Sequence, residues 1–205
     1  MPTRAELRAA LRVRLEDSPV APLWDDPALN ETLAAAVRAY GVAFPKQVTT
    51  GVTVPVGAVK VAAGVTLDAS RITRVLDAAG IWVPPWPPGE DPPGRRTPGQ
   101  AWRWWGNDLI LAEPAASSAA GLWTVEHLGG RTPPLTDGEP LDLLPGDEEI
   151  VLALAEAAAL ARRATEDAKR GIRTDARARA ESARESAERL IRGRKRRARG
   201  GRMES

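Results

Sequence analysis

The sequence of 205 residues contains no cysteine, and its only histidine is His127. The absence of cysteine excludes disulfides, thiolate metal sites and cysteine nucleophiles. A single histidine excludes His–His metal motifs, and a serine–histidine triad would depend on His127 alone. No window holds eighteen apolar residues, and the segment from Met1 to Asp17 is charged throughout, so we expect neither a membrane span nor a signal peptide. These absences predict a soluble, cytoplasmic protein that is not an enzyme.

Motifs for catalysis or cofactor binding are also lacking. His127 follows Glu126 on a predicted strand, but the sequence supplies no nucleophile and no orienting partner for it, so we interpret it as structural. The carboxylates are scattered without metal-ligand spacing, and there is no glycine-rich phosphate loop. We therefore expect no catalytic residue, no metal and no cofactor.

Charged residues of both signs are present, but they are unevenly distributed. Residues 1–161 hold 13 Lys and Arg against 20 Asp and Glu, a net charge of −7, whereas residues 162–205 hold 16 against 7, a net charge of +9. A basic terminus on an acidic body is typical of a protein whose terminus meets an acidic partner. That partner is either nucleic acid or a negatively charged protein surface.

Two amphipathic helices are predicted near the N-terminus. Thr3 and Glu6 have the spacing of a capping box, and leucines then recur every four residues. Asp26 before Pro27 predicts the N-cap of the second helix, which ends at Pro45.

In the segment that follows, apolar residues recur at every second position instead of every three or four. Valines between residues 52 and 67 alternate with other residues and are separated by glycines, which predicts short antiparallel strands, with Pro55 at an edge. Arg71 to Leu76 and Leu122 to Leu128 predict further strands. Residues 84–98 include 7 prolines and predict an extended surface loop.

Six of the seven tryptophans lie between Trp82 and Trp123. A hairpin is predicted around Gly106-Asn107. Two-residue hairpin turns require positive φ angles, which glycine and asparagine adopt readily. Alternation along its first strand places Trp102 and Trp104 on one face and Trp105 on the other. These side chains form either the core of a small β unit or a platform for a sugar or a partner. We favour the core, since this region otherwise has few large side chains.

The C-terminal part is predicted to be helical again. One helix follows Gly146-Asp147 and runs from Glu148 to Arg170, and a second spans residues 175–192. The second helix carries a heptad-like inter-helix packing seam. The seam consists of Ala176, Ala180, Ala183, Ala187 and Leu190. An alanine seam buries too little area to hold a lone helix at about 25 cal/mol per Å², so we expect it to be completed by other copies of the chain.

A cluster of cations follows this seam. The candidate residues for contact with DNA phosphate or an acidic protein groove are Arg192, Arg194, Lys195, Arg196, Arg197 and Arg199. Phosphate contacts release counterions and make binding salt-sensitive. Base-specific recognition is not expected, because no aromatic residue lies near this cluster. The alternative interpretation is a solvated terminus without a partner.

The predicted fold class is α+β, mainly α: a helical bundle of two N-terminal and two C-terminal helices with an inserted small antiparallel β region. The expected divisions are an N-terminal helical pair (1–45), the β region with its proline-rich loop (46–145), C-terminal helices (146–192) and a basic tail (193–205).

The order of these segments resembles the head–tail connector (adaptor) proteins of long-tailed bacteriophages, over about residues 4–170. The strings that carry the likeness are Pro22-Leu23-Trp24-Asp25-Asp26, Arg71-Ile72-Thr73-Arg74-Val75-Leu76, Leu122-Trp123-Thr124-Val125, Pro134-Leu135-Thr136 and Leu144-Pro145-Gly146-Asp147-Glu148-Glu149-Ile150-Val151.

The resemblance implies a structural protein of the virion neck, assembled in the host cytoplasm. It implies a homo-oligomeric ring, usually of twelve copies, that sits beneath the portal protein, extends the channel for the genomic DNA and binds the tail or a further connector protein. The C-terminal helices and basic tail would dock onto the portal. Two other hypotheses stay open: a nucleic-acid-binding protein that uses the basic arm, and a carbohydrate-binding module that uses the tryptophan hairpin.

Overall fold

The computed structural model describes residues 1–17, 20, 22–86, 100–172 and 174–200, with only the backbone for residues 197–200. The fold is α+β, as the sequence predicts, with four helices and two small antiparallel sheets in the described residues. The chain divides into a helical unit (residues 1–45 and from 130 onward) and a β unit (residues 46–129). Lys46 pairs with Gly129, so the chain enters and leaves the β unit through neighbouring strands.

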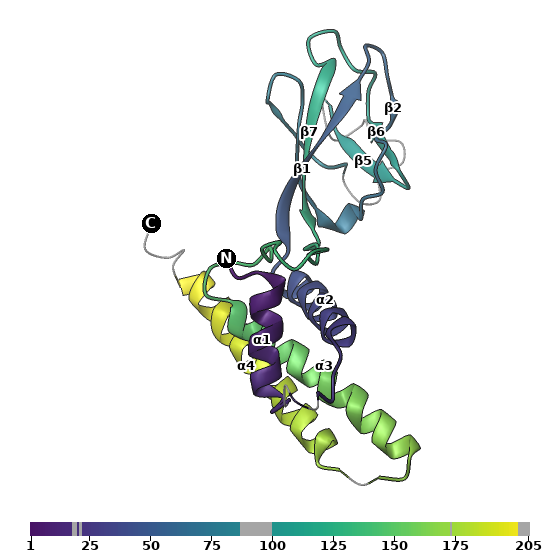
Figure 1. Cartoon of the computed structure of the whole chain (residues 1–205). Helices are drawn as coiled ribbons and strands as arrows, with labels where there is room; N and C mark the ends of the chain where they lie inside the picture. Colours follow the sequence, from purple (N-terminus) through teal and green to yellow (C-terminus); the bar gives the residue numbers. More distant parts are fainter. Residues whose placement is uncertain (18–19, 21, 87–99, 173, 201–205) are drawn as a thin grey trace. The chain divides into compact units, whose positions relative to one another are not determined.

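The helical unit contains α1 (Arg4–Arg14), α2 (Asp26–Ala43), α3 (Glu148–Lys169) and α4 (Ala176–Gly200) (Figure 1). The predicted capping box of α1 is confirmed, since the Glu6 amide donates to Thr3 and the Thr3 amide donates to the Glu6 carboxylate at 2.8 Å. The N-cap of α2 is Asp25 rather than Asp26, and its carboxylate accepts from the Ala28 amide at 2.7 Å. With Asp25 as the N-cap, Pro27 is the second residue of the helix rather than the first. Proline is tolerated at either position, because the amides of the first turn have no intrahelical acceptor and proline lacks only such an amide.

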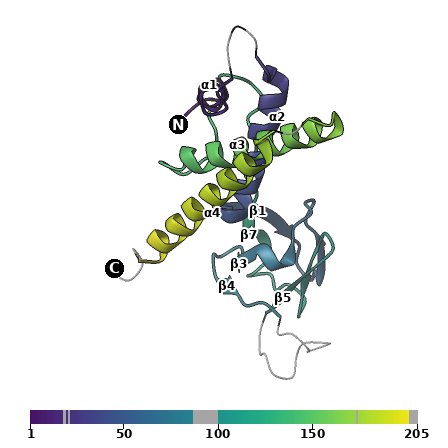
Figure 2. The same ribbon diagram turned by 90° about the horizontal axis from the view of Figure 1, so that it is seen from below.

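All four helices contribute to one apolar core. Figures 1 and 2 both show α4 running back along α3, to which it is joined by residues 170–175. The core side chains from α1 and α2 include Leu7, Leu11, Leu29, Leu33, Val37 and Tyr40, and those from α3 and α4 include Ile150, Val151, Ala155, Ala159, Leu160 and Ala180.

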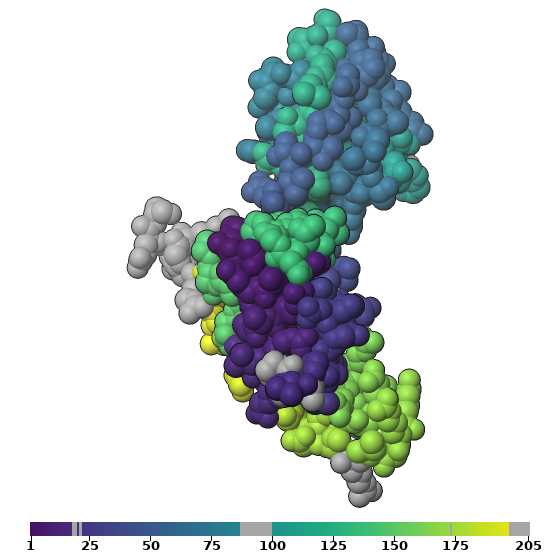
Figure 3. All heavy atoms as spheres, viewed as in Figure 1, coloured from purple at the N-terminus to yellow at the C-terminus, as the bar shows by residue number. Residues whose placement is uncertain are grey.

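The segment 130–147 belongs to this unit, so the β region ends at Gly129 and not near residue 145 as expected. Leu141 and Leu143 are buried in the helical core. In Figure 3 the segment (green) lies against the start of α1 (purple). The sequence prediction failed here because a Pro/Gly-rich loop has no periodicity that shows which unit it covers.

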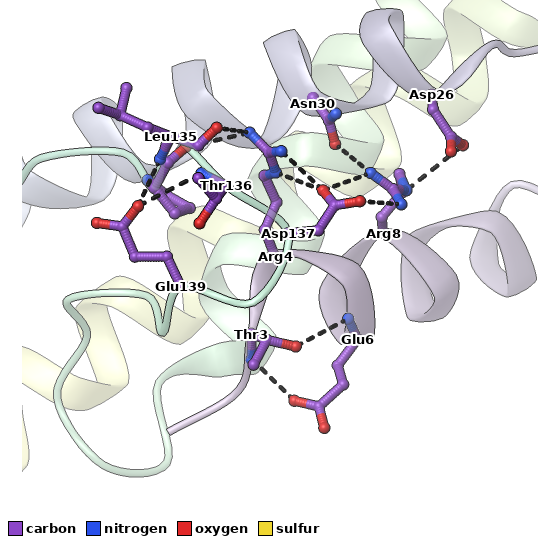
Figure 4. Close-up of polar contacts among 11 residues, drawn as sticks. Thr3, Arg4, Glu6, Arg8, Asp26, Asn30, Leu135, Thr136, Asp137 and Glu139 are labelled. Carbon is purple, nitrogen blue, oxygen red and sulfur yellow. Dashed lines mark hydrogen bonds and ion pairs between the residues drawn. The ribbon is translucent and has the colours of Figure 1, made fainter.

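Polar contacts hold this segment in place (Figure 4). Asp137 accepts from Arg4 Nε at 2.8 Å and from both terminal nitrogens of Arg8 at 2.9 Å. Arg4 also donates to the Leu135 carbonyl at 2.8 Å, and Arg8 donates to Asn30 at 3.0 Å. These charge-assisted bonds attach the loop to α1, and Arg8 in turn bonds to Asn30 of α2.

The β unit consists of two antiparallel sheets. The larger has the order β1 (Lys46–Val54), β7 (Gly121–Gly129), β3 (Ile72–Leu76) and β4 (Trp82–Val83). The smaller has the order β2 (Lys60–Ala62), β6 (Asp108–Leu111) and β5 (Trp102–Trp105). A single 3-10 turn, η1 (Ala69–Arg71), precedes β3. β1 is an edge strand, and Pro55 directly follows it.

Tryptophan and valine fill the core of the β unit. Trp102, Trp104 and Trp123 are buried, which confirms the core interpretation for these three residues. Trp105 points to the other face and is 68% exposed. The hairpin therefore does not display Trp102 and Trp104, and the carbohydrate platform that used them is excluded in this structure.

Other sequence predictions for this unit need correction. The predicted strand around Val65 and Leu67 is absent from these residues, because they lead into η1 instead. The hairpin turn has a positive φ at Gly106 alone (62°), as in a type II′ turn. Most of the proline-rich loop, residues 87–98, lies outside the described residues. No helix in the described part of the chain combines the length and apolar character needed to cross a membrane.

Candidate partner-docking surface on helix α4

The alanine seam predicted from the sequence lies inside the helical unit. Ala176, Ala180, Ala183 and Ala187 are buried, and Leu190 packs against the same core. The main neighbour of α4 is α3 of the same chain. The seam therefore needs no second copy to cover it, contrary to our expectation. Small side chains allow two helices to approach closely, but their spacing does not reveal which helix is the partner.

Polar contacts close the connection between α3 and α4. Asp167 is buried and accepts hydrogen bonds from Arg163 Nε at 3.1 Å and from Thr174 Oγ1 at 3.0 Å. Gly171 supplies the positive φ (71°) with which helix C-termini commonly end. The start of α4 is thus fixed to the end of α3.

The other end of α4 is fixed by Arg194. Its Nε lies 3.0 Å from Oδ1 of Asp147, whose side chain is only 4% exposed. The second Asp147 oxygen accepts from the hydroxyl of Tyr40 at 2.7 Å, and that hydroxyl accepts from the Leu144 amide at 3.2 Å. Burial, together with the bond to Asp147, raises the pKa of Tyr40 to about 12.

Lys195 adds a weaker contact at this end, with its Nζ 5.9 Å from the centroid of the Phe44 ring. Arg194 and Lys195, two of the predicted contact residues, are therefore partly engaged within the chain. This role could not be predicted from the sequence, because Asp147 and Tyr40 are far from Arg194 along the chain.

Two other cations of the cluster, Arg192 and Arg196, face outward. Arg192, Lys195 and Arg196 are exposed, and within the described structure neither Arg192 nor Arg196 has a carboxylate within ion-pair distance. The side chains of Arg197 and Arg199 lie outside the described part. The helix continues through Gly200, so residues 193–200 belong to α4 rather than to a separate tail. Cations at a helix C-terminus are also favoured by the helix dipole.

A second surface lies beside the first half of α4. A groove of about 1150 Å³ runs between α3 and α4, with Lys169, Arg177, Glu181 and Arg184 among the residues that line it. Most of its apolar lining is alanine: Ala157, Ala158, Ala161, Ala164, Ala168 and Ala180. We did not predict this groove. The signal in the sequence was a second alanine stripe on α3, separate from the stripe that faces the core.

No catalytic arrangement surrounds His127. It is buried, and its Nε2 lies 3.0 Å from the Thr50 hydroxyl. Its neighbour Glu126 is paired with Arg74 at 2.6 Å, and this contact lowers the pKa of the Glu126 carboxyl. Within the described residues no three His, Asp or Glu side chains are grouped closely enough to hold a metal ion.

Comparison with protein-family models and with curated proteins finds no match for this chain.

Proposed function

We propose that this chain is a structural assembly protein, a head–tail connector of a long-tailed bacteriophage. In this proposal it forms a homo-oligomeric ring of twelve copies in the virion neck, beneath the portal. The ring extends the DNA channel and presents an attachment surface for the tail or a further connector. The helical unit is the bundle of such a protein, and the β unit is its insertion.

The observation that carries the proposal is the fixed cationic end of α4. This helix has 25 residues, a length of about 37 Å at 1.5 Å per residue. Asp167 anchors its beginning through Thr174, and Asp147 anchors its end through Arg194. A helix anchored through Thr174 and Arg194 that carries the exposed Arg192 and Arg196 loses little conformational entropy when an acidic surface binds it.

The groove between α3 and α4 supports the same class of function. An apolar groove of this size with a charged rim is typical of a surface that receives another protein element. A connector needs at least two such surfaces, because each copy contacts its neighbours and also the rings above and below it. The outward cations and the groove lie on the same helix pair.

Two neutralising substitutions test the docking role. Arg192→Gln with Arg196→Gln removes two outward charges without touching Arg194 or the seam. We expect about tenfold weaker association with portal rings from the same virus, and a shallower dependence on salt, measured by sedimentation and negative-stain microscopy over a salt series.

The matched control is Arg38→Gln with Arg170→Gln, which removes the same charge from exposed positions elsewhere in the helical unit. It should associate with portals like the parent chain. The proposal is rejected if the parent protein stays monomeric and does not bind portal rings. The docking role of α4 is rejected if the two double variants bind portal rings with the same affinity.

A second candidate, nucleic-acid binding through the same helix end, is favoured by the outward position of Arg192 and Arg196. A salt series with duplex DNA separates the two functions. Tight binding by a small oligomer, with a steep loss of affinity as salt rises, favours the nucleic-acid function. Weak binding to free DNA together with ring formation favours the connector.

A further inference from the structure

On one face of the smaller sheet of the β unit, Lys60, Ala62 and Trp105 are exposed. Lys60, Ile110 and Arg103 lie opposite one another across β2, β6 and β5. Ala62, Asp108 and Trp105 form the next row, two residues along each strand. Residues two apart on a strand share a face, so all six side chains lie on the same side. The intervening row of Val61, Leu109 and Trp104 is buried in the core.

Arg103 is held between two indole rings on this face. Its guanidinium carbon lies 4.5 Å from the centroid of Trp86 and 5.6 Å from that of Trp105. Cations over tryptophan faces are attracted by the ring quadrupole, so the stack fixes the direction of the guanidinium. Trp105 remains largely exposed despite this contact.

Among the described residues, no carboxylate pairs with Arg103. The other arginines described in the β unit have carboxylate partners: Arg74 binds Glu126, and Arg71 lies 3.8 Å from Asp68. Arg103 has no carboxylate partner among the described residues, and its Nε is buried without a hydrogen-bond acceptor. Asp108, the acid on the same face, is paired with Lys60 at 2.9 Å.

These features indicate which chemical groups a ligand of this face would carry. A guanidinium without a carboxylate partner attracts an anionic group, and it is best matched by phosphate or carboxylate. An exposed indole beside it offers a face for a planar ring. A neutral sugar fits less well, because the Asp108 carboxylate, which would accept hydrogen bonds from its hydroxyls, is already paired with Lys60.

We propose that this face binds single-stranded nucleic acid, with a base stacked on Trp105 and phosphates contacted by Arg103 and Lys60. Single strands expose the faces of their bases, whereas in a duplex these faces are stacked inside. Lys60 has three donors and can contact a phosphate while it remains paired with Asp108. The proposal does not depend on ring formation or on portal docking.

The test uses the full chain carrying Arg192→Gln and Arg196→Gln, which removes the two outward-facing cations of α4 that have no carboxylate partner in the described structure. The probe is a labelled oligothymidylate of about ten nucleotides, and affinity is measured by fluorescence anisotropy. Trp105→Ala should weaken binding by roughly 5-fold to 150-fold, the range for loss of one stacked base. Arg103→Lys keeps the charge but loses the stack, and should weaken binding less than Arg103→Gln.

Trp82→Ala is the matched control, since Trp82 is 57% exposed on the other sheet of the same unit. It should leave the affinity unchanged. An abasic oligomer with the same phosphates should bind poorly. The proposal is overturned if the parent shows no binding, if the abasic oligomer or polyglutamate binds as tightly as oligothymidylate, or if Trp82→Ala and Trp105→Ala have equal effects.

Discussion

Asp137 is the carboxylate on which the attachment of the 130–147 segment depends. Hydrogen bonds from Arg8, and then from Arg4, lower its pKa to about 2. Asp26 also lies near this group, 3.4 Å from Arg8 Nε. A carboxyl whose pKa is lower in the folded chain than in the unfolded chain stabilises the fold above its ordinary pKa of 3.8. That contribution falls as the pH drops from about 4 to 2.

The substitution Asp137→Asn should therefore lower the melting temperature at neutral pH. The difference from the parent chain should shrink as the pH falls below 4 and vanish only below pH 2, where the parent carboxyl is protonated as well. Thermal unfolding followed by circular dichroism over this pH range measures the difference. A constant difference at all pH values would show that the charge of Asp137 is not what stabilises the loop.

Tyr40 has the opposite pH dependence. Its pKa is raised from 10.0 to about 12, so the folded state favours the neutral phenol. The stability that it contributes is complete below pH 10 and is lost as the pH rises toward 12. Because Tyr40 is the only tyrosine in the chain, its tyrosinate absorbance reports this one group. We expect a midpoint near pH 12 in the folded protein and near pH 10 in concentrated urea.

Tyr40→Phe should cost about 1–3 kcal/mol of unfolding free energy at neutral pH. The variant leaves the Leu144 amide without its acceptor and Asp147 without one of its donors. Urea unfolding measures the loss. The stability of the variant should also fall less between pH 10 and pH 12, because it has no phenol to ionise. If its stability falls as steeply as that of the parent, the role assigned to Tyr40 is contradicted.

For the helices, sequence periodicity predicted where each helix lies better than it predicted which other helix packs against it. The capping box at Thr3 was found because its two bonds are local and depend on a fixed spacing. The seam on α4 was also found, but its partner was not. Heptad spacing in α4 fits equally well against α3 and against a second chain, and the short connection closed by Asp167 decides between them.

The candidate site was predicted only in part for the same reason. The sequence shows a row of cations, but it cannot show that Arg194 turns inward to a buried carboxylate while Arg192 faces out. The Trp86–Arg103–Trp105 stack was missed because Trp86 and Arg103 are separated by the proline-rich segment. Contacts that join distant residues leave no periodic signal.

The close packing of α3 against α4 can be tested at one alanine. Ala187 is completely buried (0% exposed), so Ala187→Leu must displace its neighbours and should destabilise the protein by about 1–3 kcal/mol. Ala178 lies exposed on the same helix, and Ala178→Leu should change stability by less than about 0.5 kcal/mol. Urea unfolding of both variants makes the comparison. Equal stabilities would mean that the seam is not packed against α3 in solution.

At the scale of the whole molecule, the chain has two separate apolar cores. One consists of residues from the helices and the 130–147 segment, and the other consists of residues from the β unit. Six of the seven tryptophans belong to the β unit, and only Trp24 belongs to the helical unit. Tryptophan fluorescence therefore reports mainly on one core, while helical circular dichroism reports on the other.

The two probes should give different unfolding transitions, because each unit buries its own apolar surface. Ala187→Leu should move the circular dichroism transition to lower temperature and leave the main fluorescence transition in place. The converse change is Val125→Ala, in the fully buried core of the β unit. It should lower the unfolding free energy of this unit by about 1–3 kcal/mol and move the fluorescence transition to lower temperature. If either substitution moves both transitions together, the two cores unfold as one cooperative unit. The β unit is then required for the stability of the helices that carry the proposed docking surface.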